Sequence, residues 1–214
     1  MPSAPVARWQ PRVWTVGHST RSAGDFLAVL RAHDIGCLVD VRRFRGSRRH
    51  PQFGEDALAR SLADAGIAYV GVDALGGRRR LTPGPLQMGW RNTSFRAYAA
   101  FMWTDEFAEG LAQLQDCAEG RRTAMMCSEV LWWRCHRALV ADALCFLGYE
   151  VLHIAGTGAA SPHPYTAPAR ALDGELSYPE DGGVPLQTAL RAARRGTGDP
   201  SCCPDEPDLK GNGG

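Results

Sequence analysis

Residues 13–43 have the sequence VWTVGHSTRSAGDFLAVLRAHDIGCLVDVRR, and this stretch decides the fold class. Residues 13–16 are a short apolar run that predicts a β-strand, and the turn residues after it end that strand. Residues 25–32 carry apolar side chains at helical spacing, with Thr20 or Ser22 as a candidate N-cap. Residues 35–39 form the next apolar run. A strand, a helix and a strand in this order are typical of a βαβ unit with two parallel strands.

The same alternation of strands and helices continues along the chain. Further helices are predicted at residues 55–65, 95–103, 106–118 and 135–147, and further strands at 67–70, 123–126 and 150–154. The strand runs are continuously apolar, which is typical of a sheet that is covered on both faces. We therefore predict one three-layer α/β domain, in which helices flank a mostly parallel sheet of about five strands. The predicted domain covers residues 12–179, and the proline-rich, weakly apolar residues 180–214 predict a mostly disordered tail.

The composition limits the location and the partners of the protein. The 214 residues are 44% hydrophobic and carry a net charge of +1, so any nucleic-acid signal must be local. The chain has no 18-residue apolar run, and residues 1–10 lack the apolar segment of a secretory signal. Seven cysteines without a regular spacing favour free thiols in a reducing compartment. We expect a cytoplasmic protein that does not contact a membrane.

Polar residues gather where the predicted strands end. In a parallel sheet these carboxyl ends lie on one edge, where ligands bind. Four separate segments bring reactive or charged side chains to this edge, and their convergence predicts a functional site. The residues are His18, Ser19, Asp40, Arg42, Cys127, Glu129, Cys135, His136 and Arg137.

Two cysteines are candidate nucleophiles. Cys127 ends a predicted strand, the usual position of a catalytic group in this kind of fold, although a buried cysteine there is also a common inert core residue. Cys135 opens a predicted helix, and the helix dipole and free N–H groups at that end favour a thiolate. The sequence leaves the choice between Cys127 and Cys135 open.

Carboxylates and histidines supply candidate acid–base groups. Glu129 shares a strand face with Cys127 if the strand continues, and a carboxylate there requires a partner such as Arg42 or Arg137. Asp40 is the other candidate acid–base group, and it could equally form a structural ion pair with an arginine. His18 and His136 are candidate catalytic bases, and either histidine could instead cap a helix.

Two arginine-rich loops follow predicted strands and therefore belong to the same edge. Residues 42–50 contain five arginines and residues 78–80 contain three more. Arginine binds phosphate through two parallel hydrogen bonds, so this concentration predicts an anionic small molecule or a nucleic acid as the partner. Phe44, Phe53 and Trp90 could stack on bases. The predicted substrate- or anion-binding residues are Ser19, Arg42, Arg43, Arg48, Arg49 and Arg137.

A metal site is an alternative use of the two thiols. Cys127 and Cys135, together with His18 or His136, offer ligands of the kind that zinc accepts. Seven residues separate the two cysteines, which matches no standard zinc spacing, and the chain contains no CxxC motif. We therefore predict no cofactor, with zinc kept as an alternative.

Several motifs resemble those of one family in particular. They comprise TVGHST at 15–20, LVDVR at 38–42, SRRHPQF at 47–53, GIAY at 66–69, LGG at 75–77, MCSE at 126–129, CHR at 135–137, VLHI at 151–154 and PHP at 162–164. Together they resemble a bacterial and archaeal family known as domain of unknown function 488. The resemblance spans roughly residues 13–179, with Arg45 standing where the family typically has proline.

The resemblance implies an α/β fold with a shared site built from the GHS, DVR, CxE and CHR motifs. It also implies that the segment around His163 belongs to the domain. The resemblance also implies a connection with nucleic acids or DNA repair, but it implies no particular reaction.

The residues and the resemblance together favour an enzyme, either a hydrolase or a transferase, that acts on a phosphate-bearing substrate such as a nucleotide or a nucleic acid. In this hypothesis a cysteine attacks, Glu129 or Asp40 transfers a proton, and arginines hold the phosphate. Two alternatives stay open. One is a non-catalytic nucleic-acid-binding protein, and the other is a protein with a metal or redox site.

Overall fold

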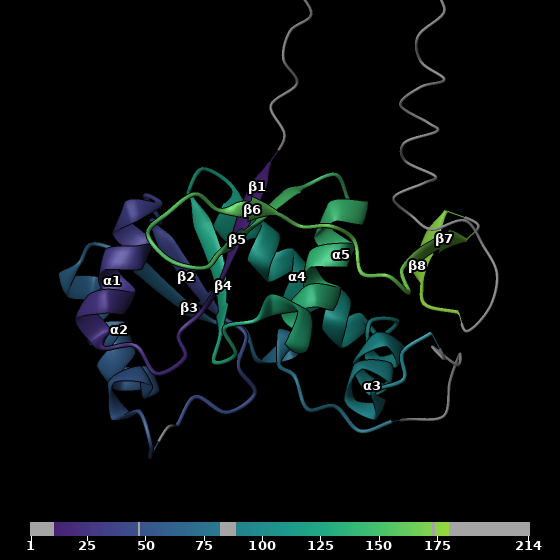
Figure 1. Ribbon diagram of the computed structural model, residues 1–214, viewed down its shortest axis with the longest axis horizontal. Helices are drawn as coiled ribbons and strands as arrows, with labels where there is room; N and C mark the ends of the chain where they lie inside the picture. Colours follow the sequence, from purple (N-terminus) through teal and green to yellow (C-terminus); the bar gives the residue numbers. More distant parts are fainter. Residues whose placement is uncertain (1–10, 47, 82–88, 173, 180–214) are drawn as a thin grey trace, which may run out of the picture.

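The computed structural model describes residues 11–46, 48–81, 89–172 and 174–179 (Figure 1). The tail predicted at residues 180–214 lies outside these ranges. Within them, five strands form the parallel part of one sheet. They are β1 (Arg12–Gly17), β2 (Cys37–Asp40), β3 (Ala68–Gly71), β4 (Thr123–Cys127) and β5 (Glu150–Ile154). The fold class predicted from the sequence is confirmed.

The sheet has the order β3-β2-β4-β1-β5-β6, so the first and fourth strands of the chain are neighbours. The register pairs Gly17 with Cys127 and Asp40 with Met126, which brings the ends of β1, β2 and β4 level with one another. The short strand β6 (Ser161–Pro162) adds to the edge of β5 in the antiparallel direction. The segments that follow these three parallel strands therefore leave the sheet at one edge.

Helices cover both faces of the sheet (Figure 1). α1 (Ala23–Ala32) and α2 (Glu55–Asp64) pack on one face, where Phe26 and Leu62 belong to the same apolar cluster as Trp14. α3 (Thr93–Phe101), α4 (Asp105–Ala118) and α5 (Arg137–Phe146) contribute to the cluster on the other face. The connections that leave β1 and β4 thus pass to opposite faces, and a crevice opens between such strands.

Local signals explain most helix boundaries. The Ser22 side chain accepts a hydrogen bond from the backbone N–H of Asp25, which selects Ser22 over Thr20 as the N-cap of α1. The predicted start of the last helix at Cys135 is wrong. Helix α5 begins at Arg137, after a 3₁₀ turn at Trp132–Arg134, and Cys135 lies between the two. Cys135 thus precedes the helix and is not part of its first turn.

The structure adds a two-stranded sheet that the sequence did not predict, formed by β7 (Arg170–Leu172) and β8 (Glu175–Ser177). Strands of two or three residues are too short to show a periodic pattern. No helix in the described ranges is both long and apolar enough to cross a membrane.

Candidate functional site

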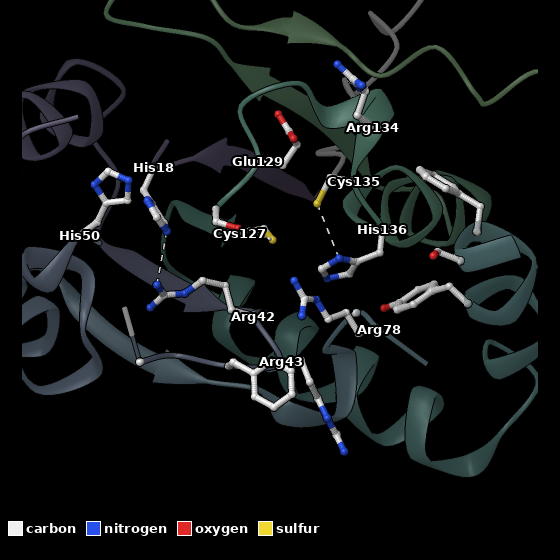
Figure 2. A pocket seen from close by; sticks show the side chains of 17 residues that line it. His18, Arg42, Arg43, His50, Arg78, Cys127, Glu129, Arg134, Cys135 and His136 are labelled. Atoms are coloured by element: carbon white, nitrogen blue, oxygen red, sulfur yellow. Dashed lines mark hydrogen bonds between the residues drawn. The ribbon is translucent and has the colours of Figure 1, made fainter. Parts of the chain in front are cut away.

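A pocket of about 560 Å³ lies at the carboxyl edge of the parallel strands (Figure 2). Its walls come from the segments after β1, β2, β3 and β4 and from α3. Side chains that the sequence assigned to one site meet in its lining. They are His18, Arg42, Arg43, Cys127, Glu129, Cys135 and His136. Ser19, Asp40, Arg48, Arg49 and Arg137, which the sequence assigned to the same site, do not line the pocket.

The two thiols of the pocket are neighbours and have opposite acidities. The Cys127 thiol donates a hydrogen bond to the Cys135 sulfur, which lowers the pKa of Cys135 to about 6. Burial opposes this shift, and hydrogen bonds from the backbone and side chain of Arg137 support it. The same bond to Cys135, together with burial, raises the pKa of Cys127 well above its usual value. Cys135 is therefore the thiolate of the pair.

Arg137 acts on the thiol pair from behind the pocket. Its side chain is 1% exposed and donates hydrogen bonds to the Thr15 hydroxyl, at 3.2 Å, and to the backbone oxygens of Glu129 and Val130. The predicted role of Arg137 as a direct anion clamp does not fit this position, because its guanidinium faces protein groups. Its charge instead favours the ionised form of Cys135.

His136 holds its ring between the backbone and the thiolate. Its Nε2 lies 3.1 Å from the Val41 carbonyl oxygen, and its Nδ1 lies 3.6 Å from the Cys135 sulfur. Because a carbonyl oxygen only accepts, Nε2 carries the proton and Nδ1 presents a lone pair. Burial lowers the pKa of His136, so the ring is neutral. A Cβ atom at Gly77 would lie 2.7 Å from Nδ1, and the absence of a side chain there admits the ring.

Asp40 and Arg42 form a buried ion pair beside the pocket. Arg42 donates from Nε to Oδ1 at 2.9 Å and from Nη2 to Oδ2 at 2.6 Å, and the Tyr69 hydroxyl also donates to Oδ2. Asp40 has no exposed surface. The sequence left two roles open for Asp40, an acid–base group and a structural ion pair, and the observed contact is the ion pair. A carboxylate enclosed in this way cannot reach a substrate. Asp40 orients Arg42.

His18 receives the other end of Arg42. The Arg42 Nη1 donates to His18 Nε2 at 3.3 Å, so His18 carries its proton on Nδ1 and donates it to the Ser19 carbonyl oxygen. Burial is the main cause that lowers the pKa of His18 to about 4, and the ring is therefore neutral near pH 7. Phe53 is fully buried and stacks on His18 at 4.1 Å between ring centroids. Phe53 is thus not available to stack on a base.

Glu129 lies at the rim of the pocket. Strand β4 ends at Cys127, so Glu129 is not held on a common strand face with that cysteine. Its carboxylate is exposed and accepts a hydrogen bond from the Leu131 backbone N–H at 3.1 Å. Neither Arg42 nor Arg137 pairs with the carboxylate, in contrast to the expectation from the sequence.

Four arginines line the pocket, and one of them points into it. Arg43, Arg78 and Arg134 join Arg42 in the lining. Figure 2 shows the Arg78 guanidinium pointing toward the middle of the pocket, whereas those of Arg43 and Arg134 point away from the thiols. Arg78 also has a backbone φ of 57°, a conformation that non-glycine residues rarely adopt and that often marks a functional position. The sequence grouped Arg78 with its neighbours and did not single it out.

A buried polar chain runs from the back of the pocket to α5. The Thr15 hydroxyl donates to His153 Nδ1 at 2.7 Å, His153 Nε2 donates to His163 Nδ1 at 2.9 Å, and His163 Nε2 donates to Asp142 Oδ1 at 2.9 Å. With Arg137 donating to Thr15, every bond runs in one direction, from a buried cation to a buried anion. Thr15, His153 and His163 all lie in motifs that carry the family resemblance, but the sequence predicted no polar chain among them. Asp142 lies inside a largely apolar helix and had no signal in the sequence.

One group of side chains could hold a metal ion. Ligand atoms of Cys127, Cys135 and His136 lie within 4.8 Å of one another, and no other such group of three occurs among the described residues. His18, the other histidine that the sequence proposed for this role, is bound to Arg42 and is not in the group.

These features define a class: an α/β protein with a thiol- and arginine-containing pocket at the carboxyl edge of its parallel strands. The family described as "Domain of unknown function DUF488" matches residues 22–144, more than half of the 214-residue chain. The chain therefore belongs to this family, as its motifs indicated. No curated protein and no solved structure matches it.

Proposed function

We propose that the protein is an enzyme that acts on a phosphate-bearing substrate, a nucleotide or a nucleic acid. Arginines bind the phosphate, and the cluster of Cys127, Cys135 and His136 is the reaction centre. The observation that carries this proposal is that Arg78 and the thiol–histidine cluster line the same cavity. One small ligand in this cavity could therefore contact both the Arg78 guanidinium and the reactive groups.

The charges of the pocket support an anionic substrate. No acidic side chain in the described ranges forms an ion pair with Arg43, Arg78 or Arg134, whereas Arg42 and Arg45 both have such partners. Glu129 is the acidic residue of the lining among the described residues. Phosphate binds well to guanidinium groups that are not already paired, because hydrogen bonds between charged groups are stronger than neutral ones. The pocket can therefore hold at least one phosphate group.

An aromatic surface at the rim supports a nucleotide over a simple phosphate ester. Phe44 is 65% exposed, and the guanidinium carbon of Arg78 lies 5.9 Å from the centre of its ring. An exposed ring next to a cation offers a stacking surface for a base whose phosphate contacts the arginine. This contact is compatible with a single nucleotide and with one nucleotide of a strand.

The reaction centre favours an enzyme over a binding protein. The pocket keeps two buried thiols, one of them with a pKa of about 6, next to a neutral histidine whose unprotonated Nδ1 faces the Cys135 sulfur. Phosphate binding needs none of these groups. Free thiols also fit a reducing compartment such as the cytoplasm, where Cys127 and Cys135 stay reduced.

Binding and turnover are tested separately. Isothermal titration of the full chain with nucleoside monophosphates and short single-stranded oligonucleotides should show an affinity that Arg78→Ala lowers by about tenfold or more. Arg60→Ala removes an exposed arginine of α2, outside the pocket lining, and should leave the affinity unchanged. Equal affinities of the wild type and Arg78→Ala would exclude Arg78 as the phosphate ligand.

Turnover is screened with the same ligands by chromatography of the products. Cys135→Ser should retain binding and lose turnover, and Cys145→Ser, which changes a cysteine outside the pocket lining, should keep both. Binding with no product from any ligand would support the alternative of a non-catalytic nucleic-acid-binding protein.

A further inference from the structure

We infer that Cys127, Cys135 and His136 form a mononuclear zinc site whose fourth coordination position is open to the pocket. This inference deepens the proposed function, because it names the chemistry of the reaction centre. It depends on the positions of three side chains and not on the identity of the substrate.

The distances match those of a zinc site. With Zn–S bonds of about 2.3 Å and Zn–N bonds of about 2.0 Å in tetrahedral geometry, a sulfur and a nitrogen ligand are roughly 3.5 Å apart, and two sulfurs roughly 3.8 Å. The Cys135 sulfur and His136 Nδ1 are 3.6 Å apart. All separations within the group are 4.8 Å or less, so a contraction of at most about 1 Å between the sulfurs, and of at most about 1.3 Å between a sulfur and the nitrogen, completes the geometry.

The ligands are held in place by the surrounding backbone. Cys127 ends β4, and its carbonyl oxygen accepts a hydrogen bond from the His18 backbone N–H at 3.0 Å. His136 donates its Nε2 proton to the Val41 carbonyl oxygen, and metal-binding histidines typically use their second nitrogen in this way. The lone pair on Nδ1 is thereby directed to the side of the thiols. The group is thus oriented as a metal site requires.

The chemistry of the group favours zinc over magnesium and calcium. Two thiol sulfurs and one imidazole nitrogen are soft or intermediate ligands, whereas magnesium and calcium prefer oxygen. Two thiolates neutralise the double charge of zinc, so the positive charge of Arg78 stays available for an anion. Arg137 lies beside the Cys135 sulfur and offsets excess negative charge there.

Three protein ligands with an accessible side are typical of catalytic zinc, whereas structural zinc has four. All three ligand residues line the pocket, and the group contains no fourth ligand from the described residues. A water molecule at the fourth position would face the cavity in which Arg78 also lies. Zinc lowers the pKa of such a water to near 7, which makes it a nucleophile near neutral pH. In the zinc-bound protein Cys135 would be a metal ligand and would not be free to attack a substrate.

The first test measures the metal content of the full chain, purified without an affinity tag from zinc-supplemented cells. Plasma mass spectrometry should find about one zinc per chain in the wild type and less than about a tenth in Cys135→Ser and His136→Asn. Cys145→Ser removes a cysteine outside the group and should retain the wild-type amount. Zinc contents that are equally low in all four proteins, or equally high, would overturn the site.

The second test does not depend on the folding of variants. Wild-type protein stripped with a chelator is titrated with cobalt(II), whose thiolate complexes absorb in the near ultraviolet and whose tetrahedral complexes absorb in the visible. We expect both bands to saturate at about one equivalent and to disappear when zinc is added. A wild-type titration without thiolate bands overturns the zinc site.

The two proposals can fail separately. Protein without cobalt bands that still binds nucleotides in an Arg78-dependent manner would refute the zinc site and leave the proposed function. Protein that binds zinc and no phosphate-bearing ligand would support the zinc site and refute the proposed substrate class.

Discussion

Among substitutions that remove one charge near the pocket, Asp40→Asn should lower the free energy of unfolding most. Asp40 is fully buried and accepts hydrogen bonds from the Arg42 backbone N–H at 3.0 Å, from two guanidinium nitrogens and from the Tyr69 hydroxyl. Asparagine has the same shape but replaces one oxygen by an NH₂ group. Whichever way the amide turns, a donor then faces a donor of Arg42, and a buried guanidinium loses its counter-charge.

The expected magnitude follows from burial. Breaking one side of a buried ion pair costs about 3–5 kcal/mol, because the remaining charge is left without compensation. Asp73→Asn is the matched control: Asp73 also pairs with an arginine, Arg45, at 2.8 Å, but its side chain is 73% exposed. Surface pairs contribute about 0–1 kcal/mol, so the two substitutions should differ by a factor of three or more in their effect on stability.

The assay is equilibrium unfolding in urea, followed by circular dichroism and by tryptophan fluorescence. Coincident transitions from the two probes justify a two-state free energy of unfolding, and an unchanged m-value shows that only stability has changed. A loss of less than about 1 kcal/mol for Asp40→Asn, or a loss equal to that of Asp73→Asn, would refute the assignment of Asp40 as the buried counter-ion of Arg42.

Three further predictions concern the buried polar groups. Burial, with smaller contributions from His163 and Arg137, lowers the pKa of His153 from 6.5 to about 3, so the unfolded chain binds a proton that the folded chain excludes. The free energy of unfolding should therefore fall as the pH drops from about 6.5 to about 3, with a smaller slope in His153→Asn, as urea titrations at each pH would show. Thr15→Val removes the hydroxyl between Arg137 and His153 and should lower the melting temperature, whereas Thr15→Ser keeps the hydroxyl and much of the stability; equal losses would contradict a role for the hydroxyl. Gly77→Ala places a methyl group 2.7 Å from His136 Nδ1 and should lower the affinity for zinc in chelator competition, and an unchanged affinity would mean that His136 is not a ligand.

Most of the fold could be predicted from residue patterns. Each parallel strand is a short apolar run that turn residues end, and each main helix has apolar side chains at helical spacing. These signals are local, because a side chain's preference for strand or helix depends on its neighbours in the chain. The strands β6, β7 and β8 were missed because two or three residues show no period. Their existence depends on contacts with segments distant in sequence.

The location of the site could also be predicted, because the ends of parallel strands meet at one edge. The sequence alone thus predicted that His18, Cys127 and Cys135 lie close together. It could not tell which arginine enters the pocket. Arg48 and Arg49 are exposed and outside the lining, whereas Arg78 points inward from a loop after β3.

The chain by itself therefore determined the order of strands and helices, the family and the edge of the sheet that carries the reactive groups. Only the tertiary structure decided that Asp40 is enclosed by Arg42, that Cys135 carries the thiolate and that His136 turns Nδ1 toward it. The physical reason is the separation along the chain between the residues that each interaction joins. Backbone preferences act between near neighbours in sequence, whereas ionisation, hydrogen bonding and metal coordination depend on distances of a few ångströms between segments that the sequence separates.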